Sequence, residues 1–302
     1  MIIGAGFSGL ITAFILDKEP IFESAEKPVE NYKPFLRFRS DAISKLTRIE
    51  FKKIHVHKGI FYQGGFHQPN IYFSNCYSKK CLKFIYSDLS IWNIDTTDYF
   101  IAPENFYYQL LDTHKKRINW KSPVNLRPHI TRGEPIITTI PMPITARELD
   151  CNIEDIEFKY APITILRYRV PQINVHQTIY FPDPQHNLFR ANITGDILIC
   201  EFSGNPETNF DFWKKELCVA FCLFGLELEE IGNGEQIYGN IIDIDESARK
   251  KIISELTKKH DVFSIGRLAT WRNIFLDDIV NDAEKIKKLI GEAGFEKRIS
   301  GI

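Results

Sequence analysis

The chain has 302 residues and a formal net charge of -1, with 44% hydrophobic and 25% charged residues. Such a chain can bury a large core as one large or two interleaved domains, and its charge balance excludes a generic polyanion binder. The charge is uneven, with 19 Lys and Arg against 12 Asp and Glu in residues 1–132 and 19 against 27 in the remainder. The basic excess is concentrated in residues 33–58, which indicates either a solvated basic face or a field that attracts an anionic partner.

The chain opens with a short apolar strand that runs into a glycine-rich turn and then a helix. The turn has Gly-x-Gly-x-x-Gly spacing: the first glycine allows a tight turn, the second lets a pyrophosphate approach the backbone, and the third lets the helix pack on the strand. A second strand ends at Glu23, 19 residues after Gly4, where a carboxylate would hold a ribose hydroxyl. A glycine turn beside a surface glutamate is the alternative reading. The predicted dinucleotide site comprises Gly4, Gly6, Phe7, Ser8, Gly9 and Glu23.

Further along, expected strands alternate with expected helices. Strands are predicted at residues 54–57, 60–62 and 71–73, at 136–140 and 262–267, and as an antiparallel set at 163–169, 178–181 and 197–202. Helices are predicted at residues 103–116, 208–224, 246–259 and 277–292. The β-branched run at 136–140 is typical of a strand buried on both faces of a parallel sheet.

Motifs at both ends and in the middle of the chain coincide with those of a known superfamily. They are the glycine turn with Glu23, the Ile-Thr-Thr-Ile-Pro run at 137–141, and Ser264-Ile265-Gly266-Arg267 followed by Asp277-Asp278-Ile279-Val280. Together they resemble the FAD-dependent amine oxidase superfamily. Residues 264–273 and 178–184 look closest to UDP-galactopyranose mutase and its relatives. The resemblance implies that the cofactor is FAD rather than a nicotinamide.

The order of these elements predicts an α/β fold, in which a Rossmann-type FAD-binding domain carries an inserted antiparallel-sheet substrate domain. The FAD-binding domain is expected to be discontinuous and to comprise residues 1–50, 100–150 and 245–302. The substrate domain is expected to comprise residues 51–99 and 151–244. The chain is shorter than most such oxidoreductases, so this second domain is expected to be reduced.

The resemblance also implies further cofactor-binding residues. A glycine-ended strand at Gly266 lets the backbone touch a flavin, Arg267 contacts the flavin or the pyrophosphate, and the helix start near Asp278 and Ile279 points N–H groups at the ring. Arg39 joins this set because residues 35–39 stand where many amine oxidases carry Arg-x-Gly-Gly.

The candidate catalytic residues are Arg190, Tyr180 and His67. Arg190, close to the Tyr180 segment, would hold a substrate carboxylate or phosphate bidentately, or else form a surface salt bridge. His67 follows the Gly64-Gly65 turn and is the histidine that we expect to line a cleft. We expect no metal, because the six cysteines are scattered and form no Cys-x-x-Cys pair.

The expected function is that of a flavoenzyme that oxidises a carbon–nitrogen bond in a small or tethered amine. The substrate is expected to be an anionic small molecule or a nucleotide-type group, with nucleic acid as a partner through the basic 33–58 segment. Modified thymine in phage DNA is one such substrate, because the Ile-, Lys- and Asn-rich composition resembles that of phage proteins. The alternative is a non-redox flavin-dependent mutase acting on a nucleotide sugar. A flavin- or nucleotide-binding protein without turnover is a third class.

The expected location is the cytoplasm, which is the host cytoplasm if the chain is viral. The first strand begins at Met1, so no signal peptide is expected. The longest apolar run, Cys218 to Leu226, is too short to span a bilayer, so no membrane association is expected. The oligomeric state stays open.

Overall fold

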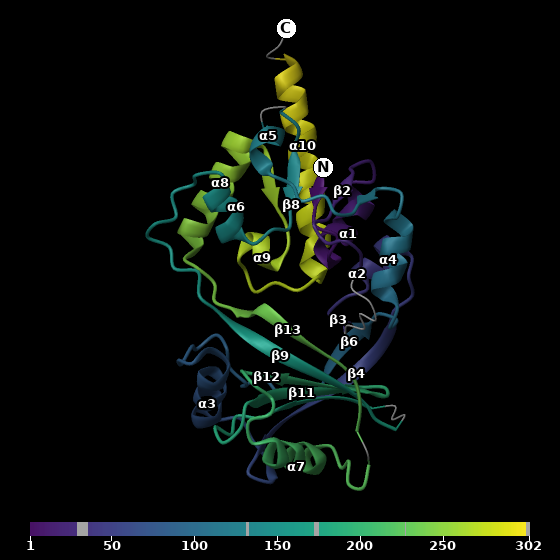
Figure 1. The fold of residues 1–302 in the computed structure, drawn as a ribbon, viewed down its shortest axis with the longest axis vertical. Coiled ribbons are helices and arrows are strands. Elements are labelled where there is room, and N and C mark those ends of the chain that lie inside the picture. Colours follow the sequence, from purple (N-terminus) through teal and green to yellow (C-terminus); the bar gives the residue numbers. More distant parts are fainter. Residues whose placement is uncertain (29–35, 131–132, 172–174, 227, 300–302) are drawn as a thin grey trace. The chain divides into compact units, whose positions relative to one another are not determined.

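The computed structural model describes residues 1–28, 36–130, 133–171, 175–226 and 228–299, and is drawn as a ribbon in Figure 1. The chain divides into two compact units. Unit 1 comprises Met1–Lys52, Phe100–Phe158 and Ile242–Ile302, and unit 2 comprises Lys53–Tyr99 and Lys159–Ile241. Among the described residues, no helix combines the length and the apolar composition needed to cross a bilayer.

Unit 1 is built on a five-stranded sheet in which every recorded strand pair is parallel. The strand order is β14 (Val262–Ser264), β8 (Ile136–Thr138), β1 (Ile2–Ile3), β2 (Ile21–Phe22) and β7 (Ile118–Asn119). The strands are short and rich in isoleucine, as expected for strands that are buried on both faces. The sheet therefore joins segments from all three parts of unit 1.

The helices of unit 1 are interspersed with its strands along the chain. They are α1 (Phe7–Ile15), α2 (Ala42–Thr47), α4 (Phe106–His114), α5 (Leu126–Ile130), α6 (Met142–Glu148), α8 (Glu246–His260), α9 (Arg267–Thr270) and α10 (Asp277–Ile299). Of these, α1, α2, α4 and α10 contribute to the core cluster of the unit. Helix α1 packs against α4 and α10, and its buried Leu10 and Ile11 belong to the same core cluster as Ile2, Ile137 and Ile279. The glycine-rich turn thus lies between a central strand and a helix that is buried along most of its length.

Unit 2 contains a mixed sheet, most of whose recorded strand pairs are antiparallel. Its strands run in the order β13 (Glu229–Ile241), β9 (Tyr160–Arg169), β12 (Ile197–Phe202), β11 (Leu188–Thr194), β10 (His176–Tyr180), β4 (Lys52–Tyr62) and β6 (Thr97–Ile101). Short β5 (Gly65–His67) pairs with β4, and in unit 1 β3 (Arg37–Phe38) pairs with the end of β6. The sheet was expected to be antiparallel, but β4 and β10 pair in parallel. These two strands are far apart in the sequence, so no hairpin connection forces them to run antiparallel.

One face of the unit 2 sheet is covered by α7 (Phe210–Ala220). Trp213 and Leu217 of this helix pack with Phe202, Phe181 and other buried residues in a second core cluster. The Trp213 indole N–H donates to the carbonyl of Pro206 at 2.7 Å, so the buried ring leaves no polar atom unsatisfied. Helix α3 (Ile71–Leu82) contacts strands β9 and β11.

A strand was predicted where the structure has the start of a helix, and the long strand β13 was not predicted. Residues 71–73 begin a helix rather than a strand, because the Asn70 side chain accepts a hydrogen bond from the Phe73 N–H at 2.9 Å and caps α3. Residues 229–241 form the long strand β13, where no strand was predicted; three glycines and several charged residues interrupt the usual strand alternation there. Two short strands expected at 54–62 form the single strand β4.

Candidate functional site

In the glycine-rich turn, neighbouring atoms leave no room for a side chain at the first and third glycines. Gly4 has a φ of 101°, and a Cβ there would lie 2.1 Å from Oγ1 of Thr139. A Cβ at Gly9 would lie 1.9 Å from the carbonyl oxygen of Gly4, so the helix approaches the strand as closely as two backbones can. Thr139 also donates to the carbonyl of Ile3 at 2.8 Å, which ties β8 to the turn.

Gly6, by contrast, faces open space. A Cβ added at Gly6 would meet no heavy atom within 4 Å, although Gly6 is the N-cap of α1. The N–H groups in the first turn of a helix have no partner within the helix, and the helix dipole favours an anion there. This turn therefore presents the N-terminus of α1 beside an open position at Gly6, a cradle whose surroundings suit a phosphate group.

The Glu23 carboxylate is held next to the same turn. It accepts hydrogen bonds from the N–H of Ala5 at 2.8 Å and from the N–H of Ala25 at 3.0 Å. The strand pairing of β2 with β1 brings Glu23 to this position. Two backbone donors thus fix the carboxylate in the place where a ribose hydroxyl would be bound.

The distant Gly266 segment reaches the glycine-rich turn directly. Gly266 has a φ of 92°, and a Cβ there would lie 2.6 Å from Oγ of Ser8 and 3.9 Å from Cδ1 of Ile279. Ile279, in the first turn of α10, is 1% exposed. Two motifs separated by more than 250 residues in the sequence therefore meet in one place.

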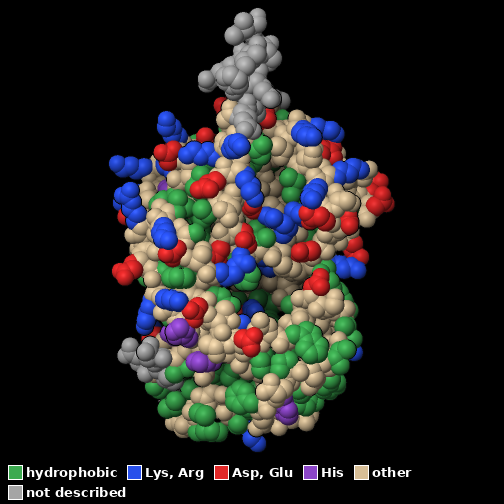
Figure 2. All heavy atoms as spheres, turned by 180° about the vertical axis from the view of Figure 1, so that it is seen from behind, with side chains coloured by type: hydrophobic (Ala, Val, Ile, Leu, Met, Phe, Trp, Pro, Cys, Tyr) green, Lys and Arg blue, Asp and Glu red, His purple; other side chains and the backbone are tan. Residues whose placement is uncertain are grey.

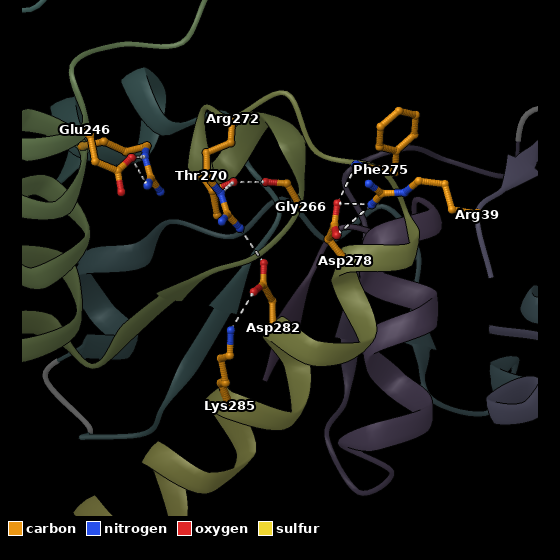
Figure 3. A network of polar contacts seen from close by, with 10 residues as sticks. Arg39, Glu246, Gly266, Thr270, Arg272, Phe275, Asp278, Asp282 and Lys285 are labelled. Atoms are coloured by element: carbon orange, nitrogen blue, oxygen red, sulfur yellow. Dashed lines mark hydrogen bonds and ion pairs between the residues drawn. The ribbon is translucent and has the colours of Figure 1, made fainter. Parts of the chain in front are cut away.

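Arg39 lies in a polar network at the start of α10, drawn in Figure 3. Its guanidinium group contacts both carboxylate oxygens of Asp278, at 2.9 and 3.0 Å, and lies 4.3 Å from the centroid of the Phe275 ring. Asp277 accepts hydrogen bonds from the N–H groups of Arg39 and Ser40, each at 3.1 Å. Residues 39–40 and the first turn of α10 are thereby fastened together.

The N–H groups near Asp278 were expected to point at a flavin. In the structure, the Asp278 N–H donates to the carbonyl of Phe275 and the Ile279 N–H to the carbonyl of Leu276, each at 3.1 Å. Both donors are engaged within the turn, so contact between these two residues and a cofactor stays a prediction.

Arg267 and Trp271 follow Gly266 in and after the short helix α9. Burial lowers the pKa of the Arg267 guanidinium. Trp271 is fully buried, and its indole N–H donates to the carbonyl of Ile242 at 2.9 Å. Trp271 is therefore a core residue, and contact between Arg267 and a cofactor stays a prediction.

In unit 2, two of the three catalytic candidates share a polar row. Tyr180 on β10 lies opposite Arg190 on β11, and Arg190 lies opposite Glu201 on β12. Nε of Arg190 donates to the Glu201 carboxylate at 2.8 Å, and the side chain of Glu201 is 12% exposed. The Tyr77 ring of α3 lies edge-on to Tyr180, with centroids 5.4 Å apart. A phenol, a guanidinium and a carboxylate are thus aligned across three strands.

The third candidate, His67, lies elsewhere in unit 2. It is exposed on β5, where its Nε2 lies 3.1 Å from the carbonyl oxygen of Tyr62. Its ring packs beside Phe73, with centroids 5.3 Å apart. The structure therefore places His67 in an exposed aromatic group rather than beside Arg190.

The basic segment is partly neutralised by ion pairs. Lys45 pairs with Asp41 at 2.9 Å and Lys53 with Asp98 at 2.8 Å, in addition to the Arg39 pair. Figure 2 shows basic and acidic side chains interspersed over the face that it draws, rather than gathered in one basic stripe. Residues 33–35 lie outside the described residues. Within the described part of the chain, no group of three or more His, Cys, Asp or Glu side chains is placed to hold a metal ion.

The fold of this chain is similar to that of several solved structures. No family model and no curated protein matches the chain. Among solved structures, that of reduced UDP-galactopyranose mutase is similar with a TM-score of 0.62 and 13% identity, over 96% of this chain and 95% of that one. The PF1083 protein from Pyrococcus furiosus is similar with a TM-score of 0.56 and 10% identity, over 95% and 97%. CtdE, solved with FAD and a substrate, is similar with a TM-score of 0.53 and 12% identity, over 94% and 77%.

The chain shares its fold with UDP-galactopyranose mutase and with FAD-bound CtdE. This similarity confirms the mixed α/β class that the sequence predicts. At such low identities the likeness concerns the fold, and the chemistry must be argued from the residues of this chain.

Some residues of the site were given no role from the sequence. Thr139 is the residue directly after β8. Asp277 precedes Asp278 at the start of a helix, where an acidic residue is favoured. Glu201 is a lone charged residue in the otherwise apolar strand β12, and this is the local signal for a buried carboxylate. Its partner Arg190 was proposed, but nothing in the sequence pairs the two.

Proposed function

We propose that this chain is a flavin-dependent enzyme that binds FAD in unit 1 and uses it in a redox reaction. The observation that carries the proposal is the meeting of two distant motifs at one turn, with Gly266 packed on Ser8 next to the open cradle at Gly6. The superfamily resemblance links the Gly266 motif to a flavin rather than to a nicotinamide. The flavoprotein fold and the fixed Glu23 carboxylate support the same cofactor.

The residues of the turn would divide the binding of FAD between them. The N-terminus of α1 and the backbone at Gly6 would hold the pyrophosphate. The Glu23 carboxylate would accept a hydrogen bond from a ribose hydroxyl. Gly266 would let backbone approach the cofactor without a side chain. FAD, when bound, supplies the acceptor for an electron pair from the substrate.

For the reaction, we propose oxidation at a carbon–nitrogen bond of a small or tethered amine, as the superfamily resemblance implies. The polar row of Tyr180, Arg190 and Glu201 is the proposed substrate-contacting part of unit 2. Glu201 offsets part of the Arg190 charge, which suits a ligand that carries both donors and acceptors better than a bare anion.

A flavin-dependent mutase acting on a nucleotide sugar is the second candidate. The fold similarity to UDP-galactopyranose mutase extends over nearly the full length of both chains, which favours keeping it. The two candidates differ in electron balance. Hydrogen peroxide released from candidate amines supports the oxidase, whereas isomerisation of a nucleotide sugar only after dithionite reduction supports the mutase.

FAD binding is tested with a pair of glycine variants. Gly6 and Gly291 both have open space at the Cβ position. Gly6→Ala should leave the melting temperature unchanged, yet weaken FAD binding at least about tenfold, because its methyl group occupies the cradle. Gly291→Ala, on the surface of α10, should retain wild-type affinity. A wild-type protein that takes up no FAD, or a Gly6→Ala variant that binds FAD normally, would refute the proposed site.

A nucleic-acid substrate, including modified thymine in phage DNA, stays a proposal that a salt titration tests. Binding of DNA through several phosphate contacts should weaken steeply between low and moderate salt. The ion pairs of Arg39, Lys45 and Lys53 lower the charge available for such contacts. Absence of binding at low salt would remove this partner.

A further inference from the structure

The first turn of α10 places two carboxylates close to the elements that we assign to an anionic cofactor. Asp277 is 9% exposed, and Asp278 directly precedes Ile279, which packs by Gly266. Gly266 in turn packs on Ser8 of the glycine-rich turn. FAD carries a negatively charged pyrophosphate, so two uncompensated carboxylates in this region would oppose its binding.

Each of these carboxylates is compensated by residues 39–40, and Figure 3 shows how Arg39 reaches across to α10. Arg39 contacts both oxygens of Asp278 while its guanidinium group lies over the Phe275 ring. Asp277 takes its donors from the backbone, at Arg39 and Ser40, and from Oγ of Ser40 at 3.1 Å. Asp278 also accepts from the N–H of Phe275 at 2.9 Å. The ion pair and the backbone hydrogen bonds therefore both hold the first turn of α10.

We propose that Arg39 is a positioning residue for the dinucleotide rather than one of its ligands. It neutralises Asp278 and fixes the first turn of α10 against Gly266 before the cofactor arrives. Pre-ordering a turn in this way lowers the entropic cost of binding, and neutralising its charge removes a repulsion. The inference rests on the proposed FAD site, and it assigns to Arg39 a role that works through Asp278.

A double-variant test separates the two roles. Arg39→Met should weaken FAD binding about fivefold, because it leaves Asp278 uncompensated at a partly exposed position. In the Arg39→Met/Asp278→Asn protein, affinity should return to within about twofold of wild type, because the carboxylate charge has gone as well. If Arg39 touched the cofactor directly, the second substitution would not restore binding. The loss in Arg39→Met should also shrink at high salt.

Arg272→Met is the matched control. Like Arg39, Arg272 forms an ion pair with an acidic residue of α10: it pairs with Asp282 at 2.6 Å. Arg272 takes no part in the contacts that residues 39–40 make with this helix. Its removal should leave FAD affinity within about twofold of wild type. An equal loss in both variants would show that α10 stability alone is responsible, and would overturn the role assigned to Arg39.

Hydrogen exchange without cofactor tests the fastening independently of FAD. Arg39→Met should speed exchange of the amides of residues 275–279, and Arg272→Met should leave them unchanged. Unchanged exchange in Arg39→Met refutes the fastening, whatever the cofactor proves to be. A wild-type protein that binds no FAD refutes the proposed function, while the exchange comparison still decides whether Arg39 holds this turn.

Discussion

Three glycines of one turn differ in what surrounds them, and that difference separates structure from function. Positions Gly4 and Gly9 are filled by Thr139 and by backbone, whereas Gly6 faces open space. The sequence spacing predicted close helix–strand packing at Gly9, and the structure confirms it. The spacing could not indicate that Thr139 closes the turn at Gly4, because that contact joins residues far apart in the chain.

Gly9→Ala should destabilise the protein without any cofactor present. The methyl group would overlap the carbonyl oxygen of Gly4, which is backbone and cannot rotate away. We expect a loss of about 3 kcal/mol in the free energy of unfolding of unit 1, measured by chemical denaturation of the cofactor-free protein. Gly6→Ala serves as the control, and equal stability of the two variants would contradict the packing described here.

Among the elements, α1 is anchored at its C-terminal end by a single arginine. Arg117, just before β7, donates to the carbonyls of Ala13 at 2.9 Å, Leu16 at 2.6 Å and Glu19 at 2.6 Å. These carbonyls lie at and just beyond the C-terminal end of α1, where the helix dipole favours a cation. The N-terminal end of α1 is thereby left for an anion while its other end is satisfied from within the protein.

Arg117→Met should cost about 2 kcal/mol of stability in unit 1, because it removes charged donors from several carbonyls at once. Lys115→Met, which removes an exposed pair with Asp112, should change stability by no more than about 0.5 kcal/mol. Thermal unfolding of both variants provides the comparison. A melting temperature for Arg117→Met equal to that of Lys115→Met would show that the arginine contributes little.

Elements whose sequence signals lie within a few residues were predicted more accurately than elements that depend on distant pairing. Helices α8 and α10 were predicted to within a residue at their first positions, because Asp245 caps α8 and acidic residues open α10. Residues 71–73 were misassigned because three apolar side chains fit a strand equally well until the Asn70 cap is considered. Strand β13 depends on pairing with β9, which no local pattern records.

On the scale of the whole molecule, each unit buries a histidine in its neutral form. Burial, with the nearby charge of Arg117, lowers the pKa of His114 in unit 1 to about 4. Burial, with the nearby charge of Lys80, lowers the pKa of His186 in unit 2 to about 3. Both histidines bind a proton more readily in the unfolded chain, so acid favours unfolding of each unit.

The free energy of unfolding should therefore fall as the pH drops from about 6.5, where the unfolded histidines begin to bind protons, toward pH 4 in unit 1 and pH 3 in unit 2. A loss of about 3 kcal/mol is expected for His114 and of about 5 kcal/mol for His186. Denaturation at several pH values checks this. His114→Leu should flatten the dependence of unit 1 alone, and His186→Leu that of unit 2 alone; an unaltered slope in either variant would contradict the assignment.

The fold class could be predicted from the sequence because a strand, a glycine turn and a helix lie next to one another in the chain. The candidate site could be predicted only in part. Gly266 and Glu23 came from their spacing and from a family resemblance, whereas the partners Asp277, Ser40 and Glu201 depend on tertiary pairing. The parallel pairing of β4 with β10 is likewise a property of the folded chain.

The strand order of unit 1 has a consequence for its synthesis on the ribosome. Its sheet takes β1 from the first residues and β14 from Val262–Ser264, while both segments of unit 2 are complete at Ile241. Translation therefore completes the synthesis of unit 2 before it makes the last strand of unit 1. Until β14 has been made, the sheet around β1 and the glycine-rich turn is incomplete, and apolar surface that β14 would cover stays exposed.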